Sequence, residues 1–180
     1  MRAQRTHERA LRVKQITSAV PVSLLYQAAA LCLFLFLAYG AAAIGGAATA
    51  TSVGTWYPAL NKPAWTPAGS TIGTVWSILY FLIGLSAWRV WLKGGLRMNA
   101  MPLGAWAVQL VLNTLWSVVF FGLQQPGWAF AELVLLWLAI LATMLLFFRK
   151  DRIGGILFLP YLAWVTFAGF LNATLWRMNV

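Results

Sequence analysis

The chain has 180 residues, of which 62% are hydrophobic and only 9% are charged. Soluble globular proteins carry roughly 45–50% apolar and about 25% charged residues. This composition excludes an ordinary soluble enzyme and a disordered chain, and it indicates one polytopic membrane domain. A net charge of +10 is also typical of nucleic-acid binding, but the basic residues lie between apolar runs. Lipid headgroups and membrane topology therefore explain them better, and we expect no nucleic-acid partner.

The chain begins with a basic segment, residues 1–21, in which arginines recur at helical spacing. We interpret this segment as a solvated tail near anionic lipid, with a targeting segment as the alternative. Together with the apolar run 24–37 and the alanines at 41–43, it also resembles a secretory signal. Removal of that signal would leave only four helices.

Five apolar runs follow, and each approaches the ~20 residues that a helix needs to cross a bilayer. They cover approximately residues 22–50, 69–92, 101–123, 127–148 and 153–176. Short stretches rich in Gly, Pro, Asn, Gln or charge separate them. Because backbone groups in lipid must pair internally, we predict an all-α integral membrane bundle of five transmembrane helices over residues 22–180.

The distribution of basic residues predicts the topology. Every one of the 13 Lys and Arg residues except Lys62 and Arg177 falls on the same side as the N-terminus. The positive-inside rule then places the N-terminus on the cytoplasmic side of a bacterial cell membrane. An organelle outer membrane is the alternative location, and there the rule need not hold.

Few residues are suited to conventional chemistry. His7 is the only histidine and Cys32 the only cysteine, so the sequence predicts no metal site and no intrachain disulfide. Glu132 is an acid within an apolar run, which suggests a proton or ion role, or alternatively a hydrated group near the interface.

Polar and aromatic residues recur on single helix faces. Gln109, Asn113 and Ser117 are spaced four residues apart in the third run. They predict either hydrogen bonds between helices or polar contacts in an apolar pocket. Pro160 is expected to kink or start the fifth helix. Trp76 and Trp164 each lie on an aromatic face, so a cleft between them would suit a flat hydrophobic ligand.

The segment 51–68 is the longest connection between the runs. Its three prolines limit its freedom and its three aromatic residues give it an apolar side. We predict that it forms a lid over one end of the bundle, with a membrane-surface loop as the alternative.

Four blocks of sequence resemble the tryptophan-rich sensory protein/translocator protein (TspO/MBR) family, also called the peripheral-type benzodiazepine receptor family. They read WYPALNKPAWTP, QLVLNTLWSVVFFG, GWAFAELVLL and PYLAWVTFAGFLNATLWRMN, and the similarity extends over about residues 40–179. The resemblance implies a five-helix bundle whose pocket is closed by the first loop. It also implies a homodimer and, as non-covalent ligands, tetrapyrroles such as protoporphyrin IX or haem, or benzodiazepine-type drugs.

The resemblance also implies the pocket residues. They are Tyr57 and Trp65 in the loop, Trp76 in the second helix, Asn113 and Ser117 in the third, Trp128, Ala131 and Leu135 in the fourth, and Trp164, Ala168 and Leu171 in the fifth. The tyrosines of the animal sterol motif are absent after Asn172, where Ala173 and Thr174 follow. High-affinity sterol binding is therefore not expected.

The sequence is also consistent with two other functions. Trp76 and Trp164 match positions linked to light-dependent porphyrin degradation, which would make the protein an enzyme that uses tryptophan as an electron donor. Alternatively, the small residues late in the first helix, such as Ala41 and Gly45, and the polar face of the third could only assemble a complex, without a saturable ligand site. The leading hypothesis is a membrane receptor or transporter for tetrapyrroles that regulates tetrapyrrole handling or stress signalling.

Overall fold

The computed structural model describes residues 23–180, and within this range the fold is entirely helical. The elements are α2 (Leu24–Ala50), α3 (Trp56–Ala59), α4 (Gly69–Trp91), α5 (Gly95–Met98), α6 (Ala100–Ser117), η1 (Val118–Gly122), α7 (Pro126–Lys150), α8 (Arg152–Ile156) and α9 (Leu159–Met178). Five of the described stretches are long and apolar enough to cross a membrane: 24–50, 69–91, 100–122, 126–150 and 152–178. The predicted five-helix bundle is thus confirmed. The basic segment 1–21 lies outside the described residues.

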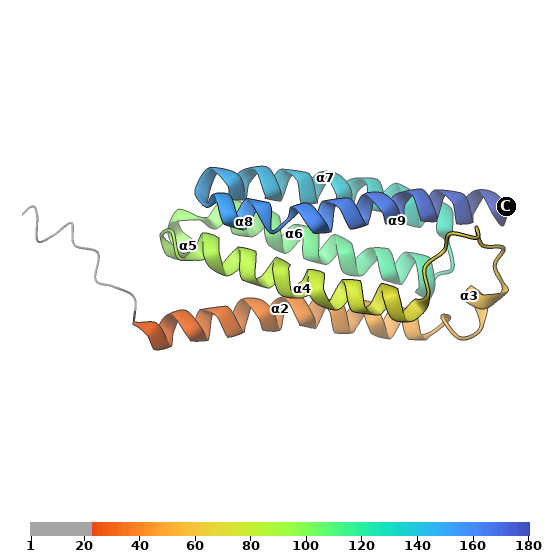
Figure 1. Ribbon diagram of the computed structural model, residues 1–180, viewed down its shortest axis with the longest axis horizontal. Coiled ribbons are helices and arrows are strands. Elements are labelled where there is room, and N and C mark those ends of the chain that lie inside the picture. Colours follow the sequence, from red (N-terminus) through yellow and green to blue (C-terminus); the bar gives the residue numbers. More distant parts are fainter. Residues whose placement is uncertain (1–22) are drawn as a thin grey trace, which may run out of the picture.

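The long helices run side by side along the long axis of the molecule (Figure 1). The helix α2 packs against α4 and α6, α6 against α7, and α7 against α9, whereas α4 and α9 touch only lightly. The short helices α5 and α8 lie at one end, and α3 lies with the C-terminus at the other. The bundle is therefore loosely joined on one side, between α4 and α9.

Two of the spanning stretches are not regular α-helices throughout. The third ends in the π-helical turn η1, in which the amide of Leu123 donates to the carbonyl oxygen of Val118 at 2.8 Å. The fifth is interrupted between α8 and α9, and Pro160 lies in the first turn of α9. Proline is tolerated there because the first turn of a helix does not need its N–H group, so Pro160 starts this helix as predicted.

An ion pair fixes the end of the bundle near α8. Arg89 of α4 donates to Asp151 from Nε to Oδ2 at 2.6 Å and from Nη2 to Oδ1 at 3.3 Å. The Ser86 hydroxyl donates to the carbonyl oxygen of Gly154 at 2.6 Å. Burial raises the pKa of Asp151, but the hydrogen bond and charge of Arg89 and the charge of Lys93 outweigh it, so the pKa lies below its usual range.

We expect the Arg89–Asp151 pair to make stability pH-dependent. The folded-state pKa is the lower one, so the contribution of Asp151 is complete above the usual value of 3.8 and is lost as pH falls through the folded-state pKa. Near pH 7, Asp151→Asn should lower the free energy of unfolding by about 1.5–3 kcal/mol, as for a hydrogen bond between charged groups. Thermal unfolding in detergent at about pH 7 and about pH 3 measures this. If the difference in thermal stability between the variant and the native protein were the same at both pH values, the Arg89–Asp151 pair would not be the cause of the pH dependence.

Candidate functional site

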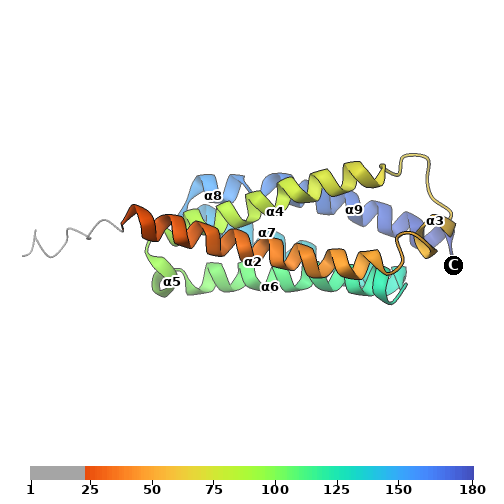
Figure 2. The same ribbon diagram turned by 90° about the horizontal axis from the view of Figure 1, so that it is seen from below.

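The site begins where α2 and α4 separate. The two helices are in close contact at Gly84, where an added Cβ would lie 3.1 Å from Leu35 Cα and 3.2 Å from the carbonyl oxygen of Phe34. From that point α4 diverges from α2 toward the end of the bundle that carries α3 (Figure 2). The absence of a side chain at Gly84 lets the two backbones approach closely there, and the divergence beyond this contact leaves space between the helices.

A cavity of about 490 Å³ occupies this space. Such a volume falls within the roughly 300–1,000 Å³ of small-molecule sites. Aromatic residues and small residues form most of its wall, and no charged side chain of residues 23–180 lines it. The aromatic and the small lining residues include Tyr39, Ala42, Gly46, Tyr57, Gly73, Trp76, Tyr80, Trp116, Phe120, Phe121, Trp164, Phe167 and Ala168. The arrangement suits a flat, apolar ligand that packs against rings.

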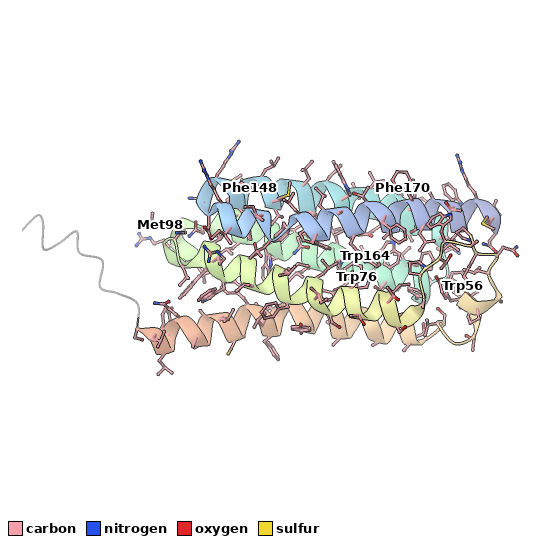
Figure 3. All side chains as sticks on the ribbon, in the orientation of Figure 1. Trp56, Trp76, Met98, Phe148, Trp164 and Phe170 are labelled. Carbon is pink, nitrogen blue, oxygen red and sulfur yellow. The ribbon has the colours of Figure 1, made fainter. Side chains whose placement is uncertain are left out.

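Seven of the predicted pocket residues line this cavity. Trp76 comes from α4 and Trp164 from α9, and Figure 3 shows the two side chains in the same stretch of the bundle. The others are Tyr57, Asn113, Ser117, Ala168 and Leu171. The structure therefore brings together residues from the loop and from three spanning stretches, as the resemblance implied; their role in binding stays a prediction.

Four predicted residues do not line the cavity. Trp128, Ala131 and Leu135 lie on an exposed face of α7, and the side chains of Trp128 and Leu135 are 73% and 58% exposed. Successive spacings of three and four residues put all three on that outward face. Trp65 packs outside the cavity wall, with its ring centroid 5.8 Å from that of Phe167. In a single chain these residues contact the surroundings instead of a ligand in the cavity.

A buried hydrogen-bond network lies beside the cavity. The Tyr80 hydroxyl donates to Oδ1 of Asn113, and Nδ2 of Asn113 donates to the Tyr161 hydroxyl at 3.0 Å. That hydroxyl in turn donates to Oε1 of Gln109 at 3.0 Å. All four side chains are buried. The polar face of the third helix thus joins helices through hydrogen bonds, and both polar ends of the Asn113 amide are already satisfied.

One buried donor at the cavity remains unpaired. The Trp164 indole Nε1 is buried and has no hydrogen-bond partner among the described residues. By contrast, Trp116 Nε1 donates to Oδ1 of Asn172 at 3.0 Å, and Nδ2 of Asn172 donates to the carbonyl oxygen of Pro126 at 2.8 Å. An unpaired buried donor carries a desolvation penalty of about 1–3 kcal/mol, so Trp164 is the group with most to gain from an acceptor on a ligand.

Glu132 is buried on α7 and does not line the cavity. Neither of its carboxylate oxygens has a hydrogen-bond partner within residues 23–180. The alternative interpretation of Glu132, a hydrated group near the membrane interface, does not fit the burial of its carboxylate. A proton or ion role stays a prediction.

The segment 51–68 lies against the end of the cavity that α3 occupies. The Ser52 hydroxyl donates to the carbonyl oxygen of Phe121 at 2.8 Å, and the ring of Tyr57 lies 5.5 Å from that of Phe121. Lys62 Nζ donates to three carbonyl oxygens of the segment, including that of Tyr57 at 2.8 Å. The lysine thus organises the segment internally, and the prolines are not its only restraint.

Asn61 and Asn179 fasten this segment to the C-terminal end of α9. The backbone N–H of Asn61 donates to Oδ1 of Asn179 at 2.9 Å, and Nδ2 of Asn179 donates to the backbone carbonyl oxygen of Asn61 at 2.9 Å. The paired bonds hold the segment against the end of α9. We call residues 51–68 the lid, and closure of the cavity by this segment stays a prediction.

We expect Asn179→Ala to loosen the lid. The variant loses both bonds to Asn61, each of which contributes about 0.5–1.5 kcal/mol, so amide hydrogen exchange at Asn61 should accelerate roughly tenfold. Thr174→Ala is the matched control, because the Thr174 hydroxyl bonds only to Phe170 of its own helix. Equal exchange at Asn61 in both variants would contradict the fastening role of Asn179.

Several cavity residues were not identified from the sequence as site residues. Tyr39, Phe121 and Phe167 line the cavity, and the Tyr39 hydroxyl donates to the carbonyl oxygen of Ser77 at 2.9 Å. Phe167 is three residues from Trp164, one turn along α9, so the recurrence of aromatic residues there was a usable signal. Phe121 lies in the π-helical turn, whose altered register the sequence does not indicate.

The sequence is similar to those of known proteins. A sequence model of the TspO/MBR family matches residues 32–177. Protein CrtK of Rhodobacter capsulatus is 42% identical over 153 residues, which cover 83% of this chain and 94% of that protein. The tryptophan-rich protein TspO of Chlorobaculum tepidum is 40% identical, with the same coverage. The human translocator protein is 40% identical over 126 residues, covering 69% of this chain and 75% of that protein.

Proposed function

The chain belongs to the TspO/MBR family of integral, multi-pass membrane proteins, and from this premise we propose that it is a receptor or transporter for tetrapyrroles. Its ligand would be protoporphyrin IX, haem or a similar flat hydrophobic molecule, held without a covalent bond in the cavity behind the lid. The single observation that carries the proposal is the cavity itself, which has aromatic walls and no charged lining residue among residues 23–180. Ligand binding would regulate tetrapyrrole handling or stress signalling.

The aromatic wall supports a planar ligand. Trp76 packs against Tyr80 and Tyr161, with ring centroids 5.6 and 6.1 Å apart. On α9, Trp164 packs against Phe167 with ring centroids 5.4 Å apart. Aromatic pairs contribute about 0.5–1.5 kcal/mol beyond their buried area, so a large conjugated ring packed against these side chains would gain from several pairs at once.

The unpaired Trp164 indole supports a ligand with hydrogen-bond acceptors. Protoporphyrin IX and haem each carry two carboxylates whose oxygens accept hydrogen bonds. An acceptor within reach of Trp164 Nε1 would satisfy the buried donor that the protein leaves without a partner. The ligand would then be oriented by one donor while its rings supply most of the contact.

The test is a titration of protoporphyrin IX in the dark, followed by tryptophan fluorescence and porphyrin absorption in detergent. Trp76→Phe and Trp164→Phe should each weaken binding up to roughly tenfold, because each removes part of an aromatic wall. Trp137→Phe is the matched control, since Trp137 bonds to Thr166 and does not line the cavity. Absence of saturable binding in folded protein would overturn the proposal.

A light-dependent porphyrin-degrading activity is the second candidate, because Trp76 and Trp164 both line the cavity. Illumination of the saturated samples distinguishes it from binding alone. A change of the porphyrin spectrum that requires both tryptophans would favour degradation. A spectrum that stays constant would leave reception or transport.

We also propose that the N-terminus is cytoplasmic and that the chain forms homodimers. The orientation rests on basic residues such as Lys93, Arg97 and Arg152, which are exposed at the end of the bundle near α5 and α8. Labelling of single cysteines from each side of the membrane tests the orientation, and cross-linking in native membranes tests the dimer.

A further inference from the structure

A second hollow lies on the outside of the bundle between α4 and α9. It is an apolar groove of about 360 Å³ lined by Val75, Ile78, Pro160, Ala163, Trp164 and Phe167, with Leu79 at its floor. Ile78 is 55% exposed, and Pro160 and Ala163 are exposed as well. Since both helices belong to spanning stretches, the groove faces the lipid.

Two side chains separate this groove from the cavity. Trp164 and Phe167 line both hollows, the cavity on one side and the groove on the other. Their rings pack together with centroids 5.4 Å apart, and the lid residue Trp65 packs against Phe167. The wall between lipid and cavity is therefore one layer of aromatic side chains at this place, instead of a helix backbone.

The weak contact between α4 and α9 favours separation of these two helices at the groove. Among the described residues no hydrogen bond joins α4 directly to α9, and the two helices touch only lightly. Their hydrogen-bonded link is indirect, through Asn113 of α6, which bonds to Tyr80 and Tyr161. At its other end α4 is fastened to the α7–α8 region by the Arg89–Asp151 pair and by the Ser86 hydroxyl. In lipid, apolar helix surfaces separate without a hydrophobic penalty, because lipid tails replace the lost contacts.

The lid, in contrast, is held by polar bonds. Opening it would break both bonds between Asn61 and Asn179, and also the Ser52 bond to Phe121. The large apolar ring of a porphyrin favours partition into the bilayer, with its carboxylates near the headgroups, and from there the ring reaches the groove without crossing bulk water.

From these observations we propose that the α4–α9 groove is the docking position and access route for apolar ligand from the bilayer, with Trp164 and Phe167 as the movable wall. This inference rests on the proposed function, since it takes the same flat ligand to the same cavity. In this account the lid does not need to open for the ligand to enter the cavity.

The test measures ligand exchange rates in protein reconstituted into lipid nanodiscs, with protoporphyrin IX in the dark as the probe. Ala163→Trp fills the groove from a position that does not line the cavity. We expect both association and dissociation to slow at least tenfold, because a blocked route affects the two directions equally. Ala107→Trp is the matched control, since Ala107 is also exposed on a spanning helix and lines neither hollow.

Asn179→Ala provides the second arm, because it loosens the lid without touching the groove. Unchanged exchange rates in this variant, together with slow exchange in Ala163→Trp, support the groove. Faster exchange in Asn179→Ala with native rates in Ala163→Trp would overturn it in favour of the lid. Native rates in Ala163→Trp alone refute the groove but leave the proposed function intact. No saturable binding in the native protein would refute the proposed function and this inference with it.

Discussion

Replacing Tyr161 by alanine is expected to destabilise the protein by about 3–5 kcal/mol, the range for loss of a large buried aromatic side chain. Tyr161 is 0% exposed, and its ring packs against those of Trp76 and Phe158 at 6.1 and 5.9 Å. The substitution leaves a cavity in the centre of the bundle and removes the hydroxyl that joins Asn113 to Gln109. Thermal or denaturant unfolding in detergent measures the change.

Tyr161→Phe separates packing from hydrogen bonding at the same position. Phenylalanine keeps the ring contacts, but it leaves Asn113 Nδ2 and Gln109 Oε1 without their partner. We expect a loss of about 1–3 kcal/mol, the penalty for buried polar groups left unpaired. If Tyr161→Ala were no more destabilising than Tyr161→Phe, packing by this ring would not stabilise the bundle.

Gly84→Ala is expected to lower the free energy of unfolding by about 1–3 kcal/mol through overpacking. An alanine Cβ would lie 2.8 Å from Leu35 Cδ2, which can move, but also 3.1 Å from Leu35 Cα and 3.2 Å from the Phe34 carbonyl oxygen, which are backbone atoms. The helices α2 and α4 would have to move apart at this contact. Unfolding midpoints in detergent provide the comparison.

Gly104→Ala is the matched control for this effect. A Cβ at Gly104 meets nothing within 4 Å, and the residue lies inside α6. Alanine favours helix by about 1 kcal/mol over glycine, so this variant should be as stable as the native protein or slightly more so. Equal destabilisation by the two substitutions would show that the close approach at Gly84 is not the cause of the lower free energy of unfolding.

The architecture could be predicted from the sequence because hydrophobic length and breaks act locally. Apolar runs long enough to span lipid, separated by Gly, Pro and charged residues, predict helices regardless of their neighbours. The π-helical turn at Val118–Gly122 was not predicted, because it gives no periodic signal of its own.

The site was predictable where a polar residue marks the inner face of a helix. Gln109 and Asn113 are polar residues in an apolar helix, and both are buried. Tyr80 was expected on the aromatic face of the second helix, but its hydrogen bond to Asn113 and the part played by Tyr161 were not predicted, because a tyrosine can face either lipid or protein.

The rotation of α7 is the clearest case of missing information. Apolar residues surround most of this helix, so no stripe indicates which side faces the bundle. The resemblance implied that Trp128, Ala131 and Leu135 contact the ligand, yet the structure places them on the outward face. Only packing against α6 and α9 settles the rotation, and the sequence does not contain that geometry in a local form.

The central claim, that the aromatic cavity between α2, α4, α6 and α9 is the ligand site, is tested most directly by filling it. Ala168 lines the cavity, so Ala168→Trp would place an indole in the space that the ligand needs. The measurement is the equilibrium dissociation constant for protoporphyrin IX in the dark, with Ala107→Trp as control and with unfolding midpoints to verify folding. We predict at least tenfold weaker binding, about 1.4 kcal/mol or more, in Ala168→Trp only. Native affinity in a folded Ala168→Trp protein would contradict the claim.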